Sequence, residues 1–172
     1  MAINYKIYKK NLISFGPIIL FYILSLTETK SNFQSFYLNF FSFNLQMMII
    51  YFWVLKRPQL IGFGHIFFAS LINDVVLGLP MGTSSIVYLI LAFITTYIRN
   101  ATLAPRMVTD WFAFIPAILI PNIIYFFIIK NFSNFNLSYI ELLQNSFFTF
   151  LFYPVVYQFF KFYLKKVEDS DA

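Results

Sequence analysis

The chain has 172 residues, of which 60% are hydrophobic and only 11% are charged, whereas soluble globular proteins carry about 25% charged residues. So few charges cannot cover the surface of a soluble globule, and we expect one membrane domain over residues 1–172 with no separate soluble domain. The absence of cysteine excludes disulfides, thiolate metal sites and cysteine nucleophiles. The net charge of +5 is attributed to membrane topology rather than to nucleic-acid binding, because Lys and Arg collect on the cytoplasmic side of membrane proteins.

Six hydrophobic runs, separated by short polar or basic joints, predict an all-α integral membrane protein with six transmembrane helices. The first run follows Lys6, Lys9 and Lys10 and so resembles a signal peptide. No convincing cleavage site of small residues follows it, and we therefore interpret it as an uncleaved helix. The predicted helices cover residues 11–26, 36–55, 60–79, 81–98, 108–129 and 139–163.

The basic residues predict that both termini are cytoplasmic. With the N-terminus inside, only Lys30 and Lys130 of the 12 basic residues fall outside, which is a strong positive-inside pattern. Four crossings would also place both ends inside, but residues 60–98 are too long for one helix and too apolar for a loop. The cytoplasmic set is Lys6, Lys9, Lys10, Lys56, Arg57, Arg99, Arg106, Lys161, Lys165 and Lys166.

The second joint begins the most informative part of the sequence. Lys56 and Arg57 are expected to close the second helix at the cytoplasmic interface, and Pro58 cannot continue that helix. With Arg99 and Arg106, the basic pair would form a cytoplasmic surface for anionic lipid head groups or for an acidic partner.

The third helix carries a face of mostly small or polar residues at i, i+4 spacing. Small residues let membrane helices approach closely, so we expect this face to lie against another helix. Its members are Gly62, Ile66, Ser70, Asp74 and Gly78.

Asp74 is the only acidic residue in the third and fourth predicted helices. A charge at the centre of a membrane costs about 2.5–3.5 kcal/mol on insertion scales, so it should be paired or hydrated. A role in proton, cation or substrate binding is one interpretation. We prefer a structural role near the outer end of the helix, where Asn73 and turn amides can satisfy the carboxylate. His65 lies about 13 Å away along the helix and on its other side, so the two form no dyad.

Gly78, Pro80 and Gly82 predict a tight outer turn between the third and fourth helices. Elsewhere, polar residues at helical spacing are expected to hydrogen-bond across helices, or to form a seam for a partner's helix. They are Asn39, Ser42 and Gln46 on the second helix and Asn145 and Thr149 on the sixth.

No constellation for catalysis is evident in the sequence. The single histidine is poorly placed for a serine triad, no carboxylate pair has useful spacing, and too few ligands accompany His65 for a metal site. We therefore expect a protein that is not an enzyme and has no cofactor.

The second joint and the third helix resemble the MreD family, the rod shape-determining membrane subunit of bacteria. The resemblance lies in Lys56, Arg57 and Pro58 and in the segment SLINDVVLGLPMG at residues 70–82. It covers about 30 residues closely, the six-helix layout agrees over the remainder, and Ser70 stands where the family is expected to favour glycine. By this resemblance, Asp74, Gly78 and Gly82 would shape a core turn or a partner surface.

Membership of that family would imply a non-catalytic scaffold of the cell-elongation complex, which inserts peptidoglycan, in the bacterial cytoplasmic membrane. Its closest expected partner is MreC, beside MreB, RodA and a class B penicillin-binding transpeptidase. The alternative from a different class is a substrate-binding membrane subunit of an energy-coupling-factor vitamin transporter. Such a pocket needs convergent polar groups, for which Asp74, Asn122 and Asn145 are the obvious candidates.

Overall fold

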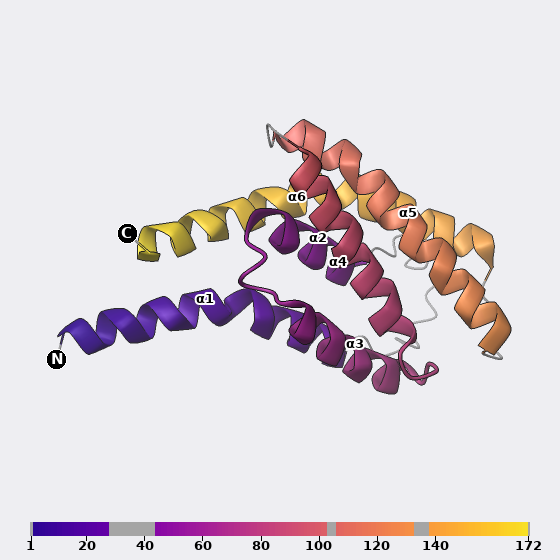
Figure 1. Ribbon diagram of the computed structural model, residues 1–172, viewed down its shortest axis with the longest axis horizontal. Coiled ribbons are helices and arrows are strands. Elements are labelled where there is room, and N and C mark those ends of the chain that lie inside the picture. Colours follow the sequence, from indigo (N-terminus) through magenta and orange to yellow (C-terminus); the bar gives the residue numbers. More distant parts are fainter. Residues whose placement is uncertain (1, 28–43, 103–105, 133–137, 172) are drawn as a thin grey trace, which may run out of the picture.

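The computed structural model consists, within the residues it describes, of six α-helices without strands (Figure 1). It describes the backbone of residues 2–27, 44–102, 106–132 and 138–171, and the side chains of residues 15–27, 44–102, 106–132 and 138–167. The helices are α1 (Ala2–Thr27), α2 (Leu45–Lys56), α3 (Phe63–Leu77), α4 (Thr83–Ala101), α5 (Met107–Phe132) and α6 (Tyr139–Asp171). The prediction of an all-α chain is confirmed for this part.

Within the described residues, three helices are long and apolar enough to cross a membrane, by length and composition: α4, α5 and residues 139–167 of α6. Residues 15–27 of α1, together with α2 and α3, form shorter apolar segments of between 10 and 17 residues in the same part of the chain. Two helices extend furthest beyond the predicted limits, since α1 begins at Ala2 and α6 continues past Tyr163 to Asp171. Residues 36–43 of the second predicted helix, with Asn39 and Ser42, lie outside the described residues.

Helix α2 lies at the centre of the bundle. Every residue from Gln46 to Leu55 is buried, and the helix contacts α1, α4, α5 and α6. A helix on the surface of a bundle buries one stripe, whereas a helix that is hydrophobic all round needs neighbours all round. The sequence of α2, LQMMIIYFWVLK, is of the second kind.

Aromatic rings join α2 to α5 and α6. The ring of Phe114 on α5 lies 4.5 Å, centroid to centroid, from both Tyr51 on α2 and Tyr153 on α6. Tyr51 and Tyr153 meet edge to face at 5.5 Å. These separations are those of favourable aromatic pairs, so the three rings fix the positions of three helices together.

The first and last helices project from the same end of the bundle (Figure 1). The N-terminal part of α1 and the C-terminal part of α6 both extend beyond the other four helices, and the two helices contact each other. The two ends of the chain therefore lie on the same side of the molecule (Figure 1).

Candidate functional site

Asp74 is completely buried near the end of α3, and its carboxylate is held by backbone N–H groups. Its Oδ2 accepts from the N–H of Gly82 and its Oδ1 from the N–H of Ser84, each at 2.8 Å. The first N–H groups of a helix have no partner within the helix, and a negative group is favoured there. Gly82 is the N-cap of α4 and has no side chain to supply an acceptor, so Asp74 caps α4 from the preceding helix.

The predicted outer turn lies between these two helices. Gly78 ends α3 in the left-handed region at φ 65°, and Gly82 precedes α4 at φ 94°. The carbonyl of Pro80 accepts from both the backbone N–H and the hydroxyl of Thr83, at 3.1 and 2.7 Å. The positive φ angles explain why glycine occupies both positions.

The small face of α3 is buried only in its central part. Ile66, Ser70 and Asp74 are fully buried, Gly62 is half-buried and Gly78 is exposed. The hydroxyl of Ser70 donates to the carbonyl of Ile66 at 2.5 Å. Helix α3 packs against α4 and α1, as expected for a face that lies against other helices.

Asn73 was expected to hydrogen-bond to the Asp74 carboxylate, but its side chain bonds elsewhere. Its Nδ2 donates to the hydroxyl of Ser84 at 3.4 Å, and its Oδ1 has no partner among the described residues. Of the expected partners of the carboxylate, the turn amides are therefore confirmed, whereas the Asn73 amide bonds to Ser84 instead.

A second buried carboxylate, Asp110 in the first turn of α5, was missed by the sequence analysis. The Nζ of Lys56 lies 2.6 Å from Asp110 Oδ2, and the exposed fractions of the two side chains are 17% and 2%. The hydroxyl of Tyr51 donates to the Asp110 carbonyl at 2.8 Å, and Lys56 Nζ lies 5.8 Å from the ring centre of Tyr157. Lys56 is thus a structural cation rather than part of an open basic surface.

Sequence spacing could not reveal this pair, because 54 residues separate its members. One signal was available, however: Lys56 follows the second predicted helix and Asp110 lies at the start of the fifth, and both positions are predicted near the same side of the membrane. An acid at the start of one helix and a base at the end of another also suit both helix dipoles.

The turn after α2 has the predicted form. Helix α2 ends at Lys56, the N–H of Arg57 donates to the Trp53 carbonyl at 2.7 Å, and the N–H of Leu60 donates to the Arg57 carbonyl at 3.0 Å. Pro58 lies inside this turn, where its missing N–H costs no helix hydrogen bond.

The predicted hydrogen bonds between helices are present at Gln46 and Thr149. Gln46 Nε2 donates to the Ser25 hydroxyl on α1 at 3.4 Å, and the Thr149 hydroxyl on α6 accepts from the backbone N–H of Asn44 at 2.9 Å. These contacts join α1, α2 and α6 and need no ligand.

The described residues do not assemble a catalytic or metal-binding constellation. No three His, Asp or Glu side chains gather in this part of the chain. His65 Nδ1 lies 3.5 Å from the hydroxyl of Tyr22 on α1, and the two rings meet edge to face. Asp74 and Asp110 belong to different helix junctions, and each carboxylate already has close partners.

The described part of the chain is thus all-helical, with three helices long and apolar enough to cross a membrane. Two buried carboxylates in this part hold helix ends in place. Comparison of the chain with protein-family models, with curated proteins and with solved structures found no match. The resemblance to the MreD family therefore depends on the segment between α2 and α4 and on the predicted helix layout.

Proposed function

We propose that this chain is a six-crossing membrane scaffold of the MreD type, a non-catalytic subunit of the cell-elongation machinery in the bacterial cytoplasmic membrane. The observation that carries the proposal is the engagement of Asp74. Both oxygens of its carboxylate are occupied by N–H groups at the start of α4, so the most conspicuous polar residue of the resembling segment serves the fold.

The arrangement of basic residues supports both termini being cytoplasmic. The Lys56–Asp110 pair brings the end of α2 to the start of α5, and thus brings Arg57 and Arg106 to one end of the bundle. Lys161, Lys165 and Lys166 follow the α6 residues that pack against α2, near the end from which the chain termini project (Figure 1). One basic end is the pattern that the positive-inside rule requires.

The transporter alternative finds less support, because its three polar candidates do not converge. Asp74 is engaged between α3 and α4, whereas Asn122 donates from Nδ2 to the hydroxyl of Ser146 at 2.6 Å between α5 and α6. Asn145 accepts from the Thr149 hydroxyl on its own helix. The cavity beside Asn122 has a volume of about 20 Å³, room for about one water and far below the ~300–1,000 Å³ of ligand sites.

A scaffold of this kind would recruit partners through faces within the membrane. Large apolar side chains are exposed along α5 and α6, including Phe127, Phe132 and Phe147, and exposed apolar surface of this kind faces lipid or a partner. We propose MreC as the direct partner, with MreB, RodA and a class B penicillin-binding transpeptidase in the same complex.

Depletion of the protein in its own host tests the proposal. Rod-shaped cells should become spheres while vitamin uptake stays normal, and the tagged chain should co-purify with MreC. Cells that keep their rod shape but lose uptake of one vitamin would overturn the scaffold and favour the transporter.

Complementation separates the two functions at the residue level. Asp74→Asn should restore rod shape to depleted cells, because an amide oxygen can still accept from an α4 N–H group. Loss of rod shape with a stable, correctly inserted Asp74→Asn protein would overturn the structural interpretation of Asp74.

A further inference from the structure

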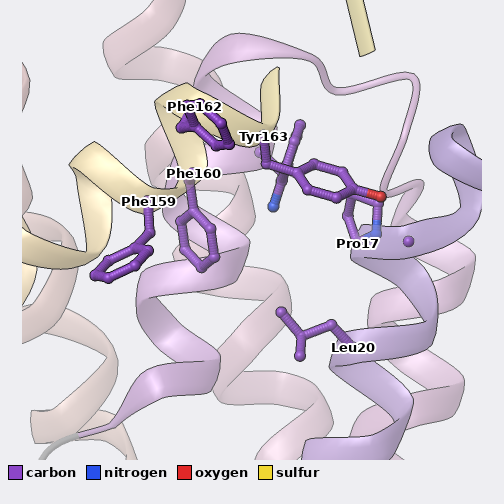
Figure 2. A pocket seen from close by; sticks show the side chains of 8 residues that line it. Pro17, Leu20, Phe159, Phe160, Phe162 and Tyr163 are labelled. Carbon is purple, nitrogen blue, oxygen red and sulfur yellow. The ribbon is translucent and has the colours of Figure 1, made fainter. Parts of the chain in front are cut away.

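A cavity of about 410 Å³ lies between α1 and α6 (Figure 2). Pro17 and Leu20 line it from α1, Phe159, Phe162 and Tyr163 from α6, and Trp53 from α2. In Figure 2 the aromatic rings of α6 and the two α1 side chains surround the space. Its volume falls within the ~300–1,000 Å³ of sites that bind small molecules.

Trp53, which lines this apolar cavity, carries a buried polar group. Its side chain is 1% exposed, and its Nε1 has no hydrogen-bond partner among the described residues. A buried donor without a partner is unfavourable. The chain's other tryptophan, Trp111, donates normally to the Phe150 carbonyl at 2.9 Å. The indole N–H of Trp53 is thus a donor that an acceptor on a bound molecule could satisfy.

A cation follows the cavity along α6. Lys166 is exposed and stands four residues after Phe162 and seven after Phe159, so it shares their helix face about one turn beyond the cavity. Lys165 is also exposed, but its position in the helix turns it to the neighbouring face. Along the direction of α6, the apolar cavity with its buried donor therefore comes first, and the surface cation follows.

We propose that the cavity binds an anionic phospholipid. One acyl chain would fill the space between α1 and α6, an ester carbonyl would accept from Trp53 Nε1, and the phosphate would face Lys166. In such a lipid the tail, the ester and the phosphate follow one another in the same order as the cavity, Trp53 and Lys166 do here. Basic residues beside membrane helices also attract anionic head groups. This inference uses the membrane location from the proposed function but not the role in cell elongation.

Fluorescence quenching by brominated lipid tests the site, because the chain has only two tryptophans. In the Trp111→Phe protein, Trp53 emission should fall at least twofold when phosphatidylglycerol vesicles carry bromine on their acyl chains. Leu20→Phe fills part of the cavity and should restore most of that emission. Ile19→Phe, an equal enlargement at an exposed neighbour outside the cavity, should not.

The contact between Lys166 and the lipid head group is tested by diluting brominated phosphatidylglycerol into unbrominated phosphatidylcholine. Lys166→Gln should raise the fraction of brominated lipid needed for half-maximal quenching at least threefold, whereas Lys165→Gln should leave it unchanged. Equal midpoints for the two variants would overturn the head-group contact.

Unquenched Trp53, or equal quenching in the Leu20→Phe and Ile19→Phe proteins, would overturn the acyl-chain site. The Trp53→Phe protein, which reports through the half-buried Trp111 alone, separates this failure from failure of the membrane location. If Trp111 is quenched while Trp53 is not, the chain is in the bilayer and only the site is wrong. If neither is quenched, the membrane location itself fails.

Discussion

Lys56 Nζ lies 2.6 Å from Asp110 Oδ2, so the last turn of α2 is tied to the first turn of α5. The same aspartate accepts from the Tyr51 hydroxyl through its backbone carbonyl. Asp110 therefore holds the central helix α2 at two residues: its side chain binds Lys56 and its backbone carbonyl binds Tyr51. Because Asp110 is almost fully buried, its carboxylate depends on Lys56 for compensation of its charge.

Lys56→Met should destabilise the protein more than most single substitutions. Removing one partner of a buried ion pair leaves an uncompensated charge and costs about 3–5 kcal/mol. Unfolding by SDS in mixed micelles measures the loss. Arg106→Gln removes an exposed cation one turn before Asp110 and should change stability by less than about 0.5 kcal/mol.

The double substitution Lys56→Met with Asp110→Leu should recover much of that loss, because an apolar pair leaves no buried charge. A double variant as unstable as the sum of the two single variants would contradict the pairing.

Asp74→Ala should destabilise the α3–α4 junction. It leaves the N–H groups of Gly82 and Ser84 without an acceptor, at about 1–3 kcal/mol for each buried group. Asp74→Asn keeps one acceptor oxygen and should lose less than half as much. Val75→Ala, at a position 62% exposed on the same helix, is the matched control. Equal losses in the Ala and Asn variants would show that the amide contacts contribute little.

Gly82→Ala should destabilise the outer turn through the backbone alone. Its φ is 94°, and a Cβ there would meet no atom within 4 Å. The loss of stability therefore comes from holding alanine in the left-handed conformation, which costs about 1–2 kcal/mol. Gly64→Ala is the control, since it lies inside α3 at ordinary φ with equally open space. That variant should gain about 0.5–1 kcal/mol in unfolding experiments. A loss of similar size at both positions would contradict this account.

The sequence predicts much of this fold because the local composition indicates where each helix lies. Apolar runs, the proline after α2 and the two glycines of the outer turn mark helix ends within a few residues. The donors to the Asp74 carboxylate were also predictable, since a buried carboxylate beside a turn finds N–H groups there. Helix lengths were less predictable: the sixth helix was predicted to end at residue 163, yet α6 continues through Lys165 and Lys166 to Asp171, because basic residues are good helix formers.

Contacts between distant segments could not be predicted in the same way. Nothing in the local pattern around Lys56 indicates Asp110, and nothing around Trp53 indicates that α1 and α6 leave a cavity beside it. Both features depend on how the helices pack around α2, and the hydrophobic pattern of α2 is too uniform to tell which neighbour covers which face.

The number of crossings is decided by the joint between α2 and α3. The chain lacks cysteine, so a single introduced cysteine reports its own side of the membrane to a maleimide that cannot cross it. With six crossings, Met81→Cys and Asn131→Cys should react in intact cells, while Gln59→Cys and Arg106→Cys should react only after permeabilisation; all four positions are exposed.

If only α4, α5 and α6 crossed, Met81, Arg106 and Asn131 would give the same result, but Gln59 would lie outside with the rest of the N-terminal half. Reaction of Gln59→Cys in intact cells would therefore overturn six crossings. It would also place Lys56 and Arg57 on the side that the positive-inside rule disfavours.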